Sequence, residues 1–442
     1  MRDLLHSPEF AQHHRLKPKH FTRKRVMNLP RVVLFILQKT TRSIARHLHD
    51  FLDALDFADA QPPNCTAGAW TRARAKLSHG ALVELNDSLL VPSAYAGSTA
   101  DASLKLWRSH RLIGFDGSVV RLPKSASTIA EFGLVEALNQ QGATGVAHCR
   151  GRVSLAYDLL NRLGWDVRLA AVTTSEVDLA ADHLDSLKPD DLALMDRGYA
   201  GYALLASMCA RGVQVVARCS TGSFAAAQEL FRRDEAGVSI QVCLKRPAGC
   251  EARGTVAERA SLPKQLHVRF VSVRLSTGEL EVLVTTLLDE QRYPSEEFAW
   301  LYHQRWGVET FYLMLKSRLD LENWSGLTLE AVRQDLAATL LLFNLESLLT
   351  RQAQQVMDTP DTNEPPRQHP QKINRAVAYH ALKSHLVDLL LGDDPPALLL
   401  DKLHSLFMAS PVTQRSRRHA PRRPQVIARS YHYQRAIKKC VF

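Results

Sequence analysis

The sequence lacks the features of a zinc protein, a disulfide-bonded protein and a membrane protein. Its seven cysteines are odd in number and scattered, without a C-x-x-C pair, which favours a reducing compartment and argues against a zinc cluster. The longest apolar stretches, residues 32–37 and 339–349, are too short to span a bilayer. The first residues lack the apolar run of a signal peptide. We therefore expect a cytoplasmic protein with no membrane segment.

Three common catalytic signatures are also absent. The sequence contains no Gly-rich phosphate loop that ends in Lys-Ser or Lys-Thr, no H-E-x-x-H pair and no G-x-S-x-G. These absences argue against a P-loop ATPase, a zinc protease of that type and an α/β-hydrolase. ATP dependence is therefore not indicated.

The chain does have size and positive charge. Its 442 residues, 45% of them hydrophobic, can bury a sizeable core and should form roughly two to four domains. Lysine and arginine outnumber aspartate and glutamate by 56 to 45, which gives a formal net charge of +11. Such a charge suits nucleic acid, but it also suits other acidic partners. Composition alone leaves the partner open.

Residues 1–100 are predicted to form a helical region that contacts DNA. Its basic segment, residues 13–25, would either follow a DNA backbone or form a flexible, solvated arm. Apolar residues then recur at helical spacing over residues 30–57, and Thr66 can cap a helix over residues 67–77. Helix, break and basic helix outline a helix-turn-helix. The side chains expected to be exposed on the second helix are Trp70, Arg72, Arg74 and Lys76, of which the three cations are candidate DNA contacts.

Residues 101–219 are predicted to form the first part of an α/β domain, because short apolar runs alternate there with helical segments. The apolar runs cover residues 112–115, 153–157, 167–172, 192–195 and 213–217, and the helical segments cover residues 175–187 and 199–210. This alternation is typical of a sheet covered by helices.

The rest of the chain is predicted to divide into four parts. Residues 220–288 alternate apolar and polar side chains and should form a mostly β insertion. Residues 289–357 return to helical spacing and complete the core, whereas residues 358–371 are rich in proline and resemble a surface linker. Residues 372–442 form a helical C-terminal region with a basic tail that is a candidate for phosphate contacts.

Two aspartates each close an apolar run. Asp116 follows Leu-Ile-Gly-Phe, and Asp196 follows Leu-Ala-Leu-Met. Carboxylates at the strand ends of one sheet supply the hard oxygen ligands that Mg²⁺ prefers. A single aspartate in such a place is more often a turn residue or a helix cap, so the case depends on a third acidic residue.

Residues 302–316 predict a helix with one functional face. At about 100° per residue, Tyr302, Arg305, Glu309 and Lys316 fall within about 60° of one another. Apolar residues cluster on the adjoining arc, which would seat the helix on a core while the polar stripe faces a groove. The alternative is a solvated face with an ion pair between Arg305 and Glu309. Periodicity alone leaves both interpretations open.

The spacing Tyr-x2-Arg-x3-Glu-x6-Lys resembles the signature of DDE transposases of the insertion sequence four family. Tyr302, Arg305, Glu309 and Lys316 match it without a gap. The resemblance extends to Phe-Asp-Gly-Ser around Asp116 and to Met-Asp-Arg-Gly-Tyr around Asp196, and it covers roughly residues 110–330.

This resemblance implies an RNase H-like core, interrupted by the β insertion between the second aspartate and the glutamate. Asp116, Asp196 and Glu309 would be the catalytic residues and would hold two Mg²⁺ or Mn²⁺ ions for cleavage and strand transfer. Tyr302, Arg305 and Lys316 would contact DNA phosphates. Trp306 would pack either on a sugar or base of the DNA or in the protein core.

The partners implied are double-stranded DNA, both as terminal inverted repeats of a bacterial insertion sequence and as target DNA, and a second copy of the chain in a synaptic homodimer. The protein would then associate with the nucleoid. One departure is that residues 220–288 contain no tryptophan, which puts a hairpin intermediate in doubt. Two alternatives stay open: a nuclease that cuts without joining, and a DNA-binding protein whose chemistry is lost.

Overall fold

The computed structural model divides into two compact units. Unit 1 comprises Met1–Ala96, Arg121–Ala130 and Ser317–Phe442, and unit 2 comprises Gly97–Val120 and Glu131–Lys316. The residues that the structure describes are 1–39, 43–55, 64–95, 105–136, 147–254, 262–275, 278–317, 321–359, 369–392 and 394–414.

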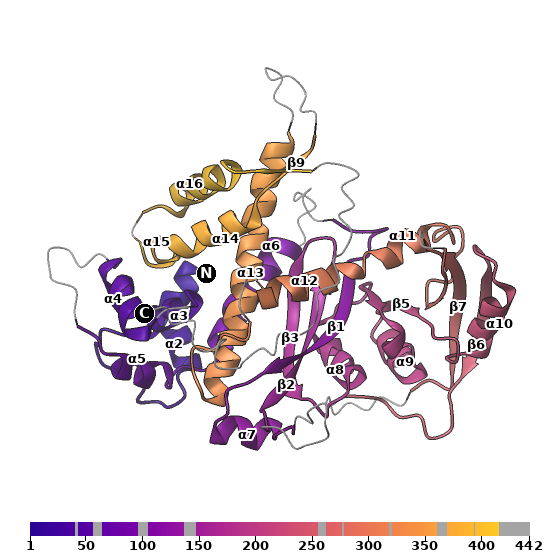
Figure 1. Ribbon diagram of the computed structural model, residues 1–442, viewed down its shortest axis with the longest axis horizontal. Coiled ribbons are helices and arrows are strands. Elements are labelled where there is room, and N and C mark those ends of the chain that lie inside the picture. The colour runs from indigo at the N-terminus through magenta and orange to yellow at the C-terminus, as the bar shows by residue number, and fades with distance from the viewer. Residues whose placement is uncertain are drawn as a thin grey trace, which may run out of the picture. The chain divides into compact units, whose positions relative to one another are not determined.

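Unit 2 is built on an eight-stranded sheet with the order β3-β2-β1-β4-β5-β8-β7-β6 (Figure 1). The strands are β1 (Leu112–Arg121), β2 (Arg150–Asp158), β3 (Leu163–Ala171), β4 (Leu192–Met195), β5 (Gln214–Arg218), β6 (Ser239–Lys245), β7 (Gln265–Arg274) and β8 (Leu280–Thr285). β4 is parallel to both β1 and β5. β5, β8, β7 and β6 pair antiparallel in turn. The predicted α/β class is confirmed.

Helices pack on this sheet, and one hydrophobic core lies on one of its faces. The helical elements are α8 (Glu176–Asp182), η1 (His183–Ser186), η2 (Arg197–Tyr199), α9 (Tyr202–Ala210), α10 (Ala225–Arg233), α11 (Glu297–His303) and α12 (Trp306–Ser317). The core contains Phe115 of β1, Met195 of β4 and Ala217 of β5, together with side chains of α8, α9 and α10. Since side chains alternate along a strand, the residue after each of these three points to the opposite face.

The predicted β insertion contains strands β6, β7 and β8, but these strands extend the main sheet from β5 rather than forming a separate layer. Arg269 shows how tightly this extension is packed. Its side chain is fully buried on β7 and donates hydrogen bonds to Ser239, the Tyr293 carbonyl and Ser295. The insertion is therefore continuous with the sheet that carries the aspartates.

Unit 1 is helical. Its helices are α1 (Arg2–His6), α2 (Pro8–His14), α3 (Leu29–Leu37), α4 (Ile44–Asp53), α5 (Ala67–Arg74), α6 (Gly80–Tyr95), α13 (Leu329–Asp358), α14 (Arg375–Ser384), α15 (Leu386–Leu391) and α16 (Pro396–Met408). Two short strands, β9 (Gln371–Lys372) and β10 (Val412–Thr413), also belong to it. Helix α7 (Ala126–Phe132) begins in unit 1 and ends in unit 2. One core joins α3, α5, α13, α14, α15 and α16. Helices from both ends of the chain thus share one interior, although the sequence assigned them to separate regions.

Two predictions about the N-terminal helices are wrong. Trp70 and Arg74 were expected to be exposed, but they are 3% and 4% exposed. Trp70 packs edge-on against Phe35 of α3, and Arg74 donates to Gln334 and Asp335 of α13. Helical spacing shows which side chains share a face, but it does not show that another helix covers that face.

The cap of α5 agrees with the sequence, because the Thr66 hydroxyl accepts a hydrogen bond from the Ala69 backbone N–H at 3.2 Å. The basic segment is held at its start, at His14 and Leu16. Leu16 donates to the Lys76 carbonyl at 2.9 Å, and Ser78 donates to the His14 carbonyl at 2.8 Å. The segment is therefore tied to the end of α5.

Residues 360–368 of the predicted linker and residues 415–442 of the basic tail lie outside the described residues. Within the described part of the chain, no helix is both long enough and apolar enough to cross a membrane.

Candidate active site

Asp116 and Asp196 occupy the same row of the sheet. β1 and β4 pair in parallel with Leu112 opposite Leu192 and Gly114 opposite Leu194. Extending this register by two residues brings the two aspartates level, and both follow a residue of the hydrophobic core. Their side chains therefore lie together on the face opposite that core. The sequence predicted this pairing from two strand ends.

One detail of that prediction is wrong. Asp116 was expected to end its strand, but β1 continues to Arg121. What changes at Asp116 is burial, because the first four residues of β1 are buried and the next three are half-buried. The apolar run in the sequence therefore marks the end of the buried part of β1, not the end of the strand.

Arg218 extends the same row and was not found as a site residue from the sequence. β4 and β5 pair with Met195 opposite Ala217, so the next pair is Asp196 and Arg218. The Arg218 guanidinium donates to Asp196 Oδ1 at 2.7 and 2.9 Å and to Glu281 Oε1 at 2.6 Å. The signal available in the sequence was an arginine that ends the apolar run of the strand next to Asp196.

The predicted helix over residues 302–316 is divided, and this corrects the assumption of one continuous stripe. α11 ends at His303 and α12 begins at Trp306. Between them the Arg305 N–H bonds to the Tyr302 carbonyl at 3.0 Å, a tight turn of three residues in place of four. Tyr302 therefore belongs to α11, whereas Glu309 and Lys316 belong to α12.

α12 is fixed over β1 and β2 by a buried tyrosine. The Tyr312 hydroxyl lies 2.9 Å from the carbonyl oxygens of both Asp116 and Val153. Phe311 beside it stacks on Tyr157 with ring centroids 4.4 Å apart. These contacts hold the helix that carries Glu309 against the strand that carries Asp116.

Arg305 is the buried centre of the signature segment. Its side chain is 4% exposed and donates to Glu309 Oε1 at 2.8 Å. The guanidinium carbon lies 5.7 Å from the Tyr302 ring and 5.3 Å from the Trp306 ring, while the Tyr302 hydroxyl lies 3.4 Å from Asp196 Oδ1. The ion pair offered as the alternative interpretation is thus present, but it faces the two aspartates.

Lys316 and Trp306 also have definite positions. The Lys316 ammonium donates to Ser118 Oγ at 2.5 Å, on β1 two residues after Asp116. It is therefore not a freely solvated side chain. Trp306 is 50% exposed, so the alternative that it packs in the core is wrong.

The two aspartates differ in the direction of their pKa shifts. Burial raises the pKa of Asp116 to about 6, and the nearby carboxylates of Glu176 and Glu309 add to this, against the Gly117 N–H and Arg305. Burial also acts to raise the pKa of Asp196, but the Arg197 N–H and the charges of Arg218 and Arg305 outweigh it and lower the pKa. Of the two aspartates, Asp116 is thus the one whose negative charge is less compensated.

The donor types and the row of the two aspartates suit a divalent cation, but the complete set is not assembled. Among the described residues, no three histidine, cysteine, aspartate or glutamate side chains are grouped so that they could hold a metal ion. Arginines bind two of the three carboxylates, since Arg218 pairs with Asp196 and Arg305 pairs with Glu309.

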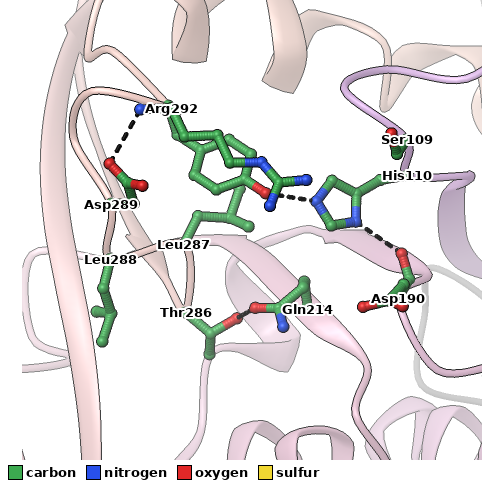
Figure 2. A pocket seen from close by; sticks show the side chains of 10 residues that line it. Ser109, His110, Asp190, Gln214, Thr286, Leu287, Leu288, Asp289 and Arg292 are labelled. Atoms are coloured by element: carbon green, nitrogen blue, oxygen red, sulfur yellow. Dashed lines mark hydrogen bonds between the residues drawn. The ribbon is translucent and has the colours of Figure 1, made fainter.

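A polar pocket in unit 2 lies elsewhere. Figure 2 shows His110, Asp190 and Gln214 lining a pocket of about 400 Å³. The His110 Nδ1–H donates to the Asp190 carbonyl oxygen, and the His110 Nε2 shares a hydrogen bond with the Tyr293 hydroxyl, both at 2.7 Å. These residues lie at the starts of β1, β4 and β5, whereas Asp196 follows the end of β4. The pocket therefore lies at the opposite ends of these strands from the carboxylates.

Unit 1 contains a basic pocket of about 360 Å³. Its cationic lining residues are Lys19, Arg23, Arg25 and Lys76. Lys76 is half-buried there, and Arg72 is exposed on α5. Of the three cations that the sequence proposed as DNA contacts, Arg74 is instead used inside unit 1.

A family model for the transposase DDE domain matches residues 107–345, more than half of the chain. The chain belongs to this family. The matched residues include Asp116, Asp196 and Glu309, so the segment with the family likeness is the one that carries the row of carboxylates.

Among solved structures, a chain from the cryo-EM structure of a piggyBac transposase synaptic complex with hairpin DNA is similar, with a TM-score of 0.43 and 9% sequence identity over 92% of this chain and 84% of that chain. No curated protein matches the chain.

Proposed function

We propose that this DDE transposase is a member of the insertion sequence four family that binds the terminal inverted repeats of its element, cleaves their ends and joins them to target DNA. The observation that carries this proposal is the row formed by Asp116 and Asp196, beneath a helix that presents Glu309. An RNase H-like core is part of the same proposal, supported by parallel β1, β4 and β5 with helices between them.

Asp116, Asp196 and Glu309 would hold two Mg²⁺ or Mn²⁺ ions, which supply charge neutralisation at the attacking and leaving oxygens of an in-line displacement. Glu309 joins the two aspartates once its pair with Arg305 opens. Arg305 would then turn its guanidinium toward a DNA phosphate, which suits its planar fork of donors. In this view Arg305 neutralises Glu309 until DNA provides a stronger partner.

Double-stranded DNA is the proposed partner, and a second copy of the chain would complete a synaptic homodimer. The basic pocket of unit 1 and Arg72 supply cations for backbone contacts. Within unit 2, Lys316 and the exposed Trp306 would supply DNA contacts of their own beside the carboxylates. We also propose that the protein acts in the cytoplasm of a bacterium, at the nucleoid.

The test uses full-length protein and labelled DNA carrying the ends that flank its gene. Asp116→Asn, Asp196→Asn and Glu309→Gln should each abolish Mg²⁺-dependent cleavage, because each removes a carboxylate oxygen while leaving the side-chain shape. Binding of end DNA should persist in all three. The matched control is Asp185→Asn, which removes a carboxylate that pairs with Arg211 in the same unit. Substantial cleavage by any of the three site variants would overturn the assignment.

A nuclease that cuts without joining is the second candidate. Precut ends separate the two functions, because a transposase should join a free 3′-hydroxyl end to supercoiled plasmid in Mg²⁺, whereas a nuclease should only nick the plasmid.

A further inference from the structure

Glu176 is a carboxylate beside Asp116 that the motifs do not include. It is the first residue of α8, and its side chain passes against Gly117 of β1. A Cβ atom placed on Gly117 would lie only 2.9 Å from Glu176 Cγ and 3.0 Å from both Cδ and Oε1. Only glycine allows this approach, so the residue after Asp116 makes room for a second acidic side chain.

Arg152 is the partner of Glu176 in this structure. Its guanidinium on β2 bonds Glu176 Oε1 and also donates to the Val172 carbonyl at 3.3 Å. The Glu176 side chain is nevertheless 40% exposed, compared with 20% for Arg152. The carboxylate is therefore held by an arginine but is open on its other side, as Glu309 is with Arg305.

A buried hydroxyl without a hydrogen bond lies on the element that follows Asp196. Tyr199 is 3% exposed, and its hydroxyl makes no hydrogen bond among the described residues. Tyr199 lies on η2, which packs against the helix α8 that carries Glu176. The pKa of Tyr199 is raised first by burial and then by the negative charges of Glu176 and Asp116. The Nε of Arg152 is likewise buried and unbonded. A buried donor without an acceptor is costly, and a bound ligand or its water would satisfy it.

We propose that Glu176 is a fourth carboxylate of the catalytic centre, which together with Asp116 binds a divalent cation and is released for this by Arg152. The Tyr199 hydroxyl would donate to the water shell of that cation. This inference rests on the proposed function, and it adds a metal ligand and a competing arginine to the three-carboxylate motif.

The competing explanation is an ion pair that only stabilises the fold. The two explanations differ in the effect of removing Arg152. If the pair is structural, Glu176→Gln and Arg152→Gln should both lower the melting temperature and leave cation affinity unchanged. If Arg152 competes with a cation for Glu176, the two variants should change cation affinity in opposite directions.

The experiment is calorimetric titration of Mn²⁺ into the full-length protein without DNA, alongside thermal unfolding of the metal-free protein. Glu176→Gln should weaken Mn²⁺ binding at least about tenfold, because losing even a residue that only supports a metal ligand costs about 10–100-fold, and Glu176→Asp should recover part of the loss. Arg152→Gln should tighten binding. Asp185→Asn, which also breaks an arginine–carboxylate pair of unit 2, should leave it unchanged.

Tyr199→Phe provides a second test of the metal site that does not depend on the ion pair between Arg152 and Glu176. Removing an unbonded buried hydroxyl should leave the metal-free melting temperature equal or higher, yet Mn²⁺ binding should weaken. Unchanged Mn²⁺ affinity in Glu176→Gln, with weakened affinity in Asp116→Asn, would overturn the role of Glu176 alone. Unchanged affinity in both variants would overturn the proposed metal centre itself.

Discussion

At the scale of single residues, the site is defined by how carboxylates and arginines are paired. Asp196 and Glu281 share Arg218, Glu309 binds Arg305, and Glu176 binds Arg152. Asp116 differs, because among the described residues it makes no hydrogen bond to an arginine, and its pKa is raised to about 6. A cation arriving at the site would therefore gain most at Asp116, where it meets the least competition.

The Arg218 bridge should be important for stability. Glu281 is 5% exposed, and its second oxygen is already buried without a partner. Arg218→Gln leaves this carboxylate without its cation, and should lower the free energy of unfolding by about 2 kcal/mol or more. Chemical denaturation at pH 7 measures this. Arg211→Gln, whose pair with Asp185 is exposed, should cost less than about 1 kcal/mol, and equal losses in the two variants would contradict the argument.

A second residue-scale prediction concerns acid. Burial acts to raise the pKa of Asp166, but the hydrogen bond and charge of His183 and the charge of Arg168 outweigh it and lower the pKa from 3.8 to about 2. Because the folded-state value is the lower one, the stabilisation is full above about pH 4 and is lost as the pH falls toward 2. The shift corresponds to about 2 kcal/mol.

The measurement is the free energy of unfolding of the parent and of Asp166→Asn between pH 2 and 7. The parent should lose its advantage over the variant below pH 4. A constant difference across the whole range would show that Asp166 does not titrate in this way.

At the scale of elements, the turn between α11 and α12 sets the geometry of the signature. It buries Arg305 between Tyr302 and Trp306 and directs Glu309 toward the sheet. Arg305→Lys keeps the charge but removes the fork of donors and its stacking on the two rings. We expect cleavage of end DNA to fall strongly in this variant, while the melting temperature falls only slightly.

Lys316→Ala is the companion variant at the other end of α12. It removes the contacts with Ser118 and Val119, which are exposed and should be worth no more than about 0.5 kcal/mol. Weakened assembly or cleavage with an unchanged melting temperature would support a DNA contact. If Arg305→Lys and Lys316→Ala both cleave end DNA at the rate of the parent protein, this segment does not contact DNA.

The elements also show what the sequence could and could not predict. The strands were predictable because their apolar runs are short and continuous, as in β4. The packing partners were not, because Arg74 meets Asp335 from 261 residues away. The same limit hid Glu176, since its position depends on Gly117 across two elements. The pairing of Asp116 with Asp196 could be predicted from two strand ends, whereas the break between α11 and α12 and the packing of distant helices could not.

At the scale of the whole molecule, positive charge should govern DNA affinity. The tail beyond Gln414 carries Arg415, Arg417, Arg418, Arg422, Arg423, Arg429, Arg435, Lys438 and Lys439 and no acidic residue. Each phosphate contact that is lost lowers the slope of log affinity against log salt by about 0.9. Removing residues 415–442, which keeps β10 intact, should therefore reduce that slope for end DNA.

Fluorescence anisotropy over a range of salt concentrations measures this slope. Arg232→Ala, which removes a cation already paired with Glu229 in unit 2, serves as the control and should leave the slope unchanged. An unchanged slope in the truncated protein would show that the tail does not contact phosphates.

The shared core of unit 1 has a consequence for the newly made protein. The apolar residues of α3 pack in one core with α13, which lies roughly 300 residues later in the chain. At about 5–20 residues per second, a ribosome needs roughly 15 to 60 s to cover that distance. During that time the N-terminal helices pack only on one another and lack the part of their core that α13 supplies. An incomplete polypeptide would thus bind DNA poorly. Binding of the transposon ends would begin only when synthesis of the chain is nearly finished.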